Sequence, residues 1–199
     1  MAVSDILVGA AKVYKAPVGE PFPDETTVDY GDAWGGNWAW LGHTKEGVKV
    51  GYTQETFEVE VDLLTNPVNE IIIKEVVLIE TMLAELTGAN MALGFNGELT
   101  TTSAGPGQRA FEQVEMGGRA DIDKYAFGLE GFYKSAFNEV FPVRVFIYIA
   151  SATVNGQLQF VKNNIAGIPL RIKAYADDAK AIGKQTMAIQ RITGEATTT

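Results

Sequence analysis

The chain of 199 residues contains no cysteine and a single histidine, His43. The absence of cysteine excludes disulfides, thiolate zinc sites and a cysteine nucleophile. With one histidine and no thiolate, a transition-metal site would depend almost wholly on oxygen ligands, which is unusual in proteins. His43 follows Gly42 at the end of a predicted strand, a position typical of a surface loop. We therefore expect no metal site and no cofactor.

Basic residues and long apolar runs are also scarce. Lys and Arg number 16 against 25 Asp and Glu, so the formal net charge is −9. Binding to phosphates needs clustered Lys and Arg, and in this sequence they are scattered. We therefore expect no specific binding of nucleic acid. The most apolar stretch, residues 140–154, contains Pro142 and Arg144 and is too short to span a bilayer. No basic segment precedes the apolar N-terminal stretch, so we expect a soluble protein made inside the cell.

Patterns of catalytic residues are missing as well. No G-x-S-x-G motif lies near His43, and the glycine-rich stretches GDAWGG and SAGPGQR lack the context of a phosphate-binding loop. Asp121 and Asp123 begin a calcium-loop pattern that no third acid continues. An enzyme that uses these two aspartates and His43 is a distant hypothesis. We expect a structural or binding protein and no enzymatic activity.

What the sequence does contain is strand-like periodicity. Residues 168–176, IPLRIKAYA, alternate between apolar and polar side chains, as in a strand with one buried face. The stretch from residue 70 to about 84 is rich in isoleucine and valine, which favours a long strand. Thr87 is then placed to cap a short helix from Gly88 to Leu93 that ends near Gly94. Further strands are expected over residues 125–133, 142–153 and 186–192, and Asn155-Gly156 is a hairpin-turn signal that precedes QLQFVK.

These patterns predict a mainly β (α+β) fold, a β-sandwich or small barrel with one short flanking helix and an extended N-terminal arm. The expected organisation is an arm over residues 1–30, a single β domain over residues 31–192 and a flexible tail over residues 193–199. A strand is compatible with residues 8–14 of the arm, but the prolines and glycine of APVGEPFPDE prevent regular structure after it. Residues 97–107, GELTTTSAGPG, are a loop by composition.

An acidic alternation follows a tryptophan-rich stretch. Glu46-Gly47 resembles a hairpin turn, and the segment after it, residues 52–62, would be the returning strand. In that strand Phe57, Val59 and Val61 alternate with Glu58, Glu60 and Asp62, so three carboxylates are expected on one face. From the pattern alone, a solvated outer strand is a sufficient explanation.

The order of features resembles the tail tube protein, or major tail protein, of long-tailed bacteriophages. The resemblance is carried by the Pro/Gly-broken arm VYKAPVGEPFPD, the element NWAWLGHTKEGV, a charged strand that ends at Asp62 before Asn66-Pro67-Val68, and a long strand that runs into Glu85-Leu86-Thr87. The NGQ hairpin and the I-P-L strand follow in the second half. Gly88 departs from the pattern, since related chains have a better helix former after the cap.

The resemblance implies a structural virion protein that is made and assembled in the bacterial host cytoplasm and resides in the virion tail. Six copies of such proteins form a ring, and the rings stack into a hollow tube, as in the related needle tube of type VI secretion. The implied partners are further copies of the chain, a tape-measure protein, and tail terminator and baseplate proteins. DNA passes through the lumen without specific binding during ejection, and no membrane is involved.

Two sets of residues receive roles on this basis. Glu58, Glu60 and Asp62 are expected to face the lumen, where fixed negative charge would repel DNA weakly and let it slide. Contacts between subunits or rings are expected from the arm (Pro17, Pro21, Phe22 and Pro23) and from the strand tip (His43, Lys45 and Glu46), although mobile surface loops explain these segments equally well. The alternative function is a carbohydrate- or peptide-binding β-sandwich module that uses the Trp38/Trp40 hairpin.

Overall fold

The computed structural model describes residues 7–134, 139–158 and 166–194. One large antiparallel sheet has the strand order β2-β1-β7-β8-β9-β4-β3, with β10 paired to β8, and a second sheet holds β5 and β6. The elements are β1 (Leu7–Ala16), β2 (Ala39–Trp40), β3 (Thr44–Val59), β4 (Asn69–Leu83), α1 (Gly88–Phe95), β5 (Glu98–Thr102), β6 (Phe111–Glu115), β7 (Lys124–Lys134), β8 (Val140–Val154), β9 (Ile168–Tyr175) and β10 (Met187–Arg191).

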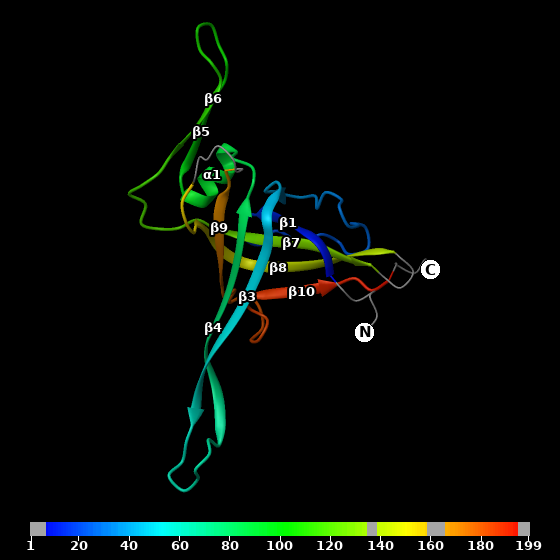
Figure 1. Ribbon diagram of the computed structural model, residues 1–199, viewed down its shortest axis with the longest axis vertical. Helices are drawn as coiled ribbons and strands as arrows, with labels where there is room; N and C mark the ends of the chain where they lie inside the picture. Colours follow the sequence, from blue (N-terminus) through cyan, green and yellow to red (C-terminus); the bar gives the residue numbers. More distant parts are fainter. Residues whose placement is uncertain (1–6, 135–138, 159–165, 195–199) are drawn as a thin grey trace.

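The main sheet bends so that its two halves run in different directions. In Figure 1, β1, β7, β8 and β10 run across the view, while β9, β4 and β3 run along the long axis. The long strand β8 joins the halves, because its first part pairs with β10 and its last part with β9. The predicted mainly β fold with one short helix is confirmed.

The core lies on the inner side of this bend. Thirteen buried apolar side chains make one cluster: Val13, Leu41, Ile79, Leu83, Leu93, Phe127, Leu129, Ile147, Ala150, Ala152, Ile168, Leu170 and Ile172. The alternation predicted over residues 168–176 is confirmed, since Ile168, Leu170 and Ile172 are buried on one face of β9. Strands β4, β7, β8 and β10 also lie where the sequence predicts them.

Helix α1 covers one end of the core and begins as predicted. The Thr87 side chain accepts a hydrogen bond from the backbone N–H of Asn90 at 3.2 Å, which caps the first turn. The helix ends one residue after Gly94, and Asn96 adopts a left-handed conformation with φ of 51°. The buried side chain of Asn90 donates to the carbonyl of Leu41 at 2.8 Å and so ties the helix to the tryptophan-rich segment.

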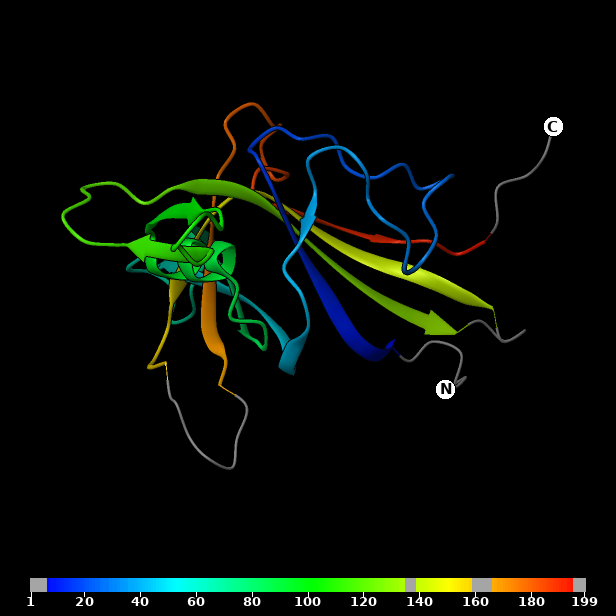
Figure 2. The same ribbon diagram turned by 90° about the horizontal axis from the view of Figure 1, so that it is seen from above.

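Residues 17–38, called the strap from here on, cover the outer face of β1, β7 and β8 (Figure 2). Leu7–Ala16 form β1, which pairs with β7 along its length, so this part of the predicted arm belongs to the main sheet. Under the strap, Trp34 stacks on Tyr14 with ring centroids 4.2 Å apart. Trp34 lies directly over Gly128 of β7, where any side chain would occupy the space of the indole ring.

A buried ion pair fastens the strap to the sheet. Glu130 of β7 and Arg144 of β8 are cross-strand partners, both fully buried, and the Arg144 Nε donates to Glu130 Oε1 at 3.1 Å. The Trp34 indole N–H donates to the same carboxylate at 3.1 Å, and Arg144 also donates to the carbonyl of Val28. The pair is thus hydrogen-bonded to the segment that covers it, as a buried charge requires.

The predicted turn at Glu46-Gly47 is wrong. Both residues have positive φ, 70° and 76°, as the turn chemistry suggested, but they form a β-bulge inside β3. The strand continues to Val59 and returns as β4 after a loop over residues 60–68. The loop predicted over residues 97–107 is also wrong in part, because Glu98–Thr102 form β5 and pair with β6. The QLQFVK segment after Asn155-Gly156 lies partly outside the described residues, at 159–162.

Candidate assembly surfaces

The β3–β4 hairpin projects far beyond the body of the molecule (Figure 1). Its outer half pairs residues 51–59 of β3 with residues 69–78 of β4, and almost every side chain there is exposed. The exposed apolar residues of this hairpin and its loop are Val50, Tyr52, Phe57, Val61, Leu63, Leu64, Val68, Ile71, Ile72 and Ile73. So many apolar side chains on one projection are unusual for a monomer and indicate a surface that another molecule covers.

The two faces of the outer hairpin differ in chemistry. Phe57 pairs with Ile71 across the strands, while the adjacent pair is Glu58 with Glu70. Because neighbouring residues on a strand point to opposite faces, the apolar pair and the acidic pair lie on opposite sides of the ribbon. Two carboxylates directly opposite each other repel. One face of the hairpin is thus apolar near its end, and the other is acidic.

Only part of the predicted row of carboxylates lies on this strand. Glu58 is in β3, but the strand ends at Val59, so Glu60 and Asp62 belong to the loop over residues 60–68. Strand alternation therefore does not place these two on the face of Glu58. The acid that does share that face is Glu70, which the sequence did not single out. Its pairing depends on where the chain turns, and the turn was predicted too early.

Polar contacts hold the middle of the hairpin together. The Tyr52 hydroxyl donates to Glu75 Oε1 at 2.6 Å, and the Gln54 amide donates to the same oxygen at 3.1 Å. The hydrogen bond from Tyr52 lowers the pKa of Glu75, and the same bond raises the pKa of Tyr52. Lys74 and Glu55 form a cross-strand ion pair at 3.4 Å. These groups are exposed, so their contribution to stability is small.

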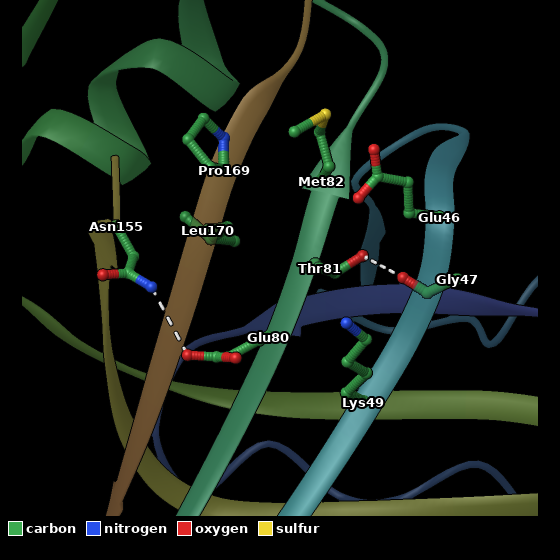
Figure 3. A pocket seen from close by; sticks show the side chains of 9 residues that line it. All are labelled: Glu46, Gly47, Lys49, Glu80, Thr81, Met82, Asn155, Pro169 and Leu170. Atoms are coloured by element: carbon green, nitrogen blue, oxygen red, sulfur yellow. Dashed lines mark hydrogen bonds between the residues drawn. The ribbon is translucent and has the colours of Figure 1, made fainter. Parts of the chain in front are cut away.

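A small cavity lies beside the bulge of β3, with a volume of about 150 Å³ (Figure 3). The Glu80 carboxylate accepts hydrogen bonds from the Arg171 guanidinium at 2.9 Å and from the Asn155 side-chain amide at 3.3 Å. The Thr81 hydroxyl donates to the backbone carbonyl of Gly47. These contacts join β3, β4 and the region around β9. The carboxylate is paired with a cation and the Thr81 hydroxyl is bonded to the backbone, so these polar groups serve to hold the strands together.

The predicted contact residues near the bulge lie on the surface. His43 is exposed, its ring meets the edge of Trp40 at a centroid distance of 5.0 Å, and its backbone N–H donates to Glu85 at 3.0 Å. Lys45 pairs with Met82, and Glu46 is exposed in the bulge. Nothing in a single chain tests whether these three residues contact another subunit, so their role stays a prediction.

The strap residues divide into two groups. Pro17 and Pro21 are exposed, whereas Pro23 is buried and Phe22 stacks on Phe146 of β8 with ring centroids 4.1 Å apart. Phe22 and Pro23 therefore pack on their own chain. The two ends of the strap are joined by Glu20, whose carboxylate accepts hydrogen bonds from the backbone and side-chain N–H groups of Asn37, both at 2.8 Å. These hydrogen bonds lower the pKa of Glu20.

The tryptophans do not form a shared platform for a ligand. Trp34 is buried, and the indole N–H of Trp38 donates to the carbonyl of Pro21 at 2.7 Å. Only Trp40 is largely exposed, at 46%, and it lies in β2, which has two residues. The Trp38/Trp40 hairpin that a carbohydrate- or peptide-binding function would need is thus absent from the described residues.

The remaining candidates for chemistry have structural contacts. Asp123 accepts from Arg119 at 2.9 Å, and the carbonyl of Asp121 accepts from the Asn96 amide at 3.0 Å. Within residues 7–134, 139–158 and 166–194, no group of three or more His, Asp and Glu side chains is arranged to hold a metal ion. Over the same residues, no helix is both long and apolar enough to span a membrane.

Comparison with known proteins identifies the family of the chain. The family model described as phage tail tube protein matches residues 3–188, which is most of the chain. A search of curated proteins finds no match. The resemblance drawn from the sequence is thereby confirmed, and the family points to a structural, non-enzymatic component of the virion tail. The chain belongs to the phage tail tube protein family.

Proposed function

We propose that six copies of this chain join into a ring and that the rings stack into the hollow tube through which DNA leaves the virion. The observation that carries the proposal is the exposed apolar surface of the β3–β4 hairpin in a member of the tail tube family. A surface of this kind is stabilised when copies of the chain cover it. Head-to-tail contacts close into rings or continue along an axis, and a tube needs both.

The acidic face of the hairpin supports a role for charge in the lumen. Glu58 and Glu70 lie opposite each other on the face that carries no apolar pair at the hairpin end. In our proposal this face lines the bore, and Glu60 and Asp62 of the adjoining loop lie near it. Duplex DNA carries a phosphate charge about every 1.7 Å along its axis. Fixed negative charge in the bore therefore repels the DNA along its whole length, and the DNA moves without sticking.

The same proposal gives the chain its partners and its place of assembly. The tube would grow in the host cytoplasm around a tape-measure protein and end at tail terminator and baseplate proteins. The exposed members of the predicted contact set (Pro17, Pro21, His43 and Glu46) and the half-buried Lys45 remain candidates for contacts between rings. Phe22 and Pro23 support such contacts only indirectly, because they hold the strap on its own sheet.

Imaging of the purified chain tests the ring and tube. Sedimentation velocity over a range of concentrations should show a species of six chains, and negative-stain images should show rings and, at high concentration, tubes. Particles of one chain at every concentration would contradict the proposal. The control is the variant Phe57→Ser/Ile71→Ser, in which the exposed apolar pair of the hairpin is polar.

The lumen assignment has its own test. A phage that carries Glu58→Lys, Glu60→Lys and Asp62→Lys together should assemble tails of normal length but eject its genome more slowly, because the bore then attracts DNA. The matched control reverses three exposed acids away from the hairpin: Glu25→Lys, Asp29→Lys and Asp178→Lys. Normal ejection from normally assembled tails of the first variant would refute the lumen assignment and leave the tube itself unaffected.

A further inference from the structure

The chain contains two asparagine–glycine pairs, Asn96-Gly97 and Asn155-Gly156. In such a pair the backbone nitrogen of the glycine can attack the side-chain amide carbon of the asparagine, because glycine has no side chain that obstructs the approach. The asparagine is then slowly converted to an acidic residue. In a folded chain this reaction depends on how firmly the asparagine side chain and the glycine nitrogen are held, and the two pairs differ in both respects.

The pair Asn96-Gly97 is held at every group that would have to react. The Asn96 side-chain amide donates to the carbonyl of Asp121 at 3.0 Å, and its side-chain oxygen accepts from the backbone N–H of Asp123 at 3.1 Å. The Gly97 N–H, which would have to attack, donates to the carbonyl of Ala92 at 2.9 Å. Three hydrogen bonds would therefore have to break before the reaction could begin.

The pair Asn155-Gly156 lies just after the end of β8 and is exposed. The Asn155 side-chain amide donates to Glu80 at 3.3 Å, and its oxygen points away from that carboxylate (Figure 3). The same Glu80 oxygen accepts two shorter hydrogen bonds from Arg171, at 2.9 and 3.2 Å, so it keeps these partners when the amide turns away. The Gly156 N–H donates to no described group.

We propose that Asn155 is a site of spontaneous deamidation and that Asn96 is protected from it. The Gly156 nitrogen bonds to Cγ of Asn155 while the bond from Cγ to Nδ2 breaks. The proton lost by Gly156 reaches the leaving nitrogen through water, and ammonia departs. Water then opens the cyclic imide at either carbonyl carbon and leaves aspartate or isoaspartate, with no change of oxidation state. The inference does not depend on the proposed function.

The product weakens the contacts between β4 and β9. Its carboxylate stands where the Asn155 amide donated to Glu80, so two carboxylates compete for the guanidinium of Arg171. Isoaspartate also adds a methylene group to the main chain of the residue whose N–H donates to the carbonyl of Pro169 at 2.8 Å. Because a virion does not replace its proteins, the change accumulates with the age of the particle.

Peptide mass spectrometry tests the site directly. Trypsin releases residues 145–162, whose single asparagine is Asn155, and residues 75–109, in which fragmentation distinguishes Asn96 from Asn90. The folded chain is incubated at mildly alkaline pH, and the gain in mass that accompanies loss of the amide is followed over time. Three hydrogen bonds hold the pair at Asn96 and one long bond holds Asn155, so conversion should be at least about tenfold faster at Asn155.

The control is the same chain incubated in urea, where both pairs should convert at similar rates because the folded contacts are lost. Asn155→Gln is the matched variant, since its longer side chain closes the ring far more slowly, and its peptide should keep its mass. Equal rates at Asn155 and Asn96 in the folded chain would overturn the proposal. So would a wild-type peptide 145–162 that keeps its mass in the folded chain while it converts in urea.

The effect on the strands has a separate readout. Asn155→Ser removes the amide without adding charge, whereas Asn155→Asp adds the carboxylate of the product. At neutral pH the aspartate variant should unfold at a lower urea concentration than the serine variant, and the difference should disappear in acid, where the carboxylates are protonated. Identical unfolding of the two variants at neutral pH would refute the weakening of these contacts.

Discussion

Making the hairpin polar should block assembly without unfolding the chain. Phe57 and Ile71, the pair on the apolar face, are 57% and 49% exposed, so about half of each side chain remains to be buried when a neighbour covers it. Full burial of a phenylalanine or isoleucine side chain contributes about 1.5–3 kcal/mol. The double variant Phe57→Ser/Ile71→Ser therefore loses about 1.5–3 kcal/mol at each contact between copies. Since 1.4 kcal/mol corresponds to a factor of ten, the concentration needed for assembly should rise about 10- to 140-fold.

The assay is sedimentation velocity across a concentration series, with urea unfolding measured in parallel. Substitutions of exposed residues change the free energy of unfolding by about 0.5 kcal/mol or less. The urea unfolding curves of the double variant and of the wild-type chain should therefore nearly coincide. Ile122→Ser is the matched control, since Ile122 is 45% exposed and lies outside the hairpin. The reasoning is refuted if the double variant assembles at the wild-type concentration, or if Ile122→Ser weakens assembly equally.

Three further predictions concern the strap. Gly128→Ala places a methyl group in the space of the Trp34 ring and should destabilise the chain by about 1–3 kcal/mol in urea unfolding; an unchanged midpoint would contradict this packing. Glu130→Gln leaves the buried guanidinium of Arg144 without its counter-charge and should cost about 3–5 kcal/mol in the same assay, whereas a loss under 1 kcal/mol would argue against a fully desolvated pair. The pKa of Glu20 lies below its ordinary 4.5 in the folded chain, so its contribution is present above that pH and lost as the pH falls through the lowered value; tryptophan fluorescence should report loosening of the strap there, and Glu20→Gln should remove this step.

Local signals predicted those elements whose structure depends on neighbouring residues. Thr87 caps α1 because its hydroxyl reaches the N–H of Asn90 within one turn, and the alternation of residues 168–176 matches the buried face of β9. In such segments the sequence period and the burial agree, so the prediction needs no knowledge of distant contacts.

The β3–β4 hairpin shows why the turn and the acidic face were predicted wrongly. Glu46 and Gly47 do adopt the positive φ angles that a tight turn needs, but a β-bulge uses the same angles. What decides between the two is pairing with β4, which lies more than thirty residues away along part of the ladder. The error moved the turn, and with it the partner of Glu58, so Glu70 went unnoticed and Glu60 and Asp62 were assigned to a strand that ends before them.

Burial under the strap was equally out of reach of local patterns. Phe22 and Pro23 lie in a proline-rich stretch whose composition predicts an extended arm, and the stretch is indeed irregular. Its packing against Phe146, however, follows from the aromatic surface that β8 presents, together with the buried pair of Glu130 and Arg144. Neither residue of that pair belongs to a motif, and only the register of β7 on β8 brings them together.

A cryo-electron microscopy reconstruction of the assembled chain tests the central claim most directly. The account predicts a hollow tube of stacked six-membered rings, in which neighbouring copies cover the apolar face of each β3–β4 hairpin and Glu58 faces the bore. A solitary particle at every concentration, or a tube whose hairpins lie on its outer surface, would contradict it.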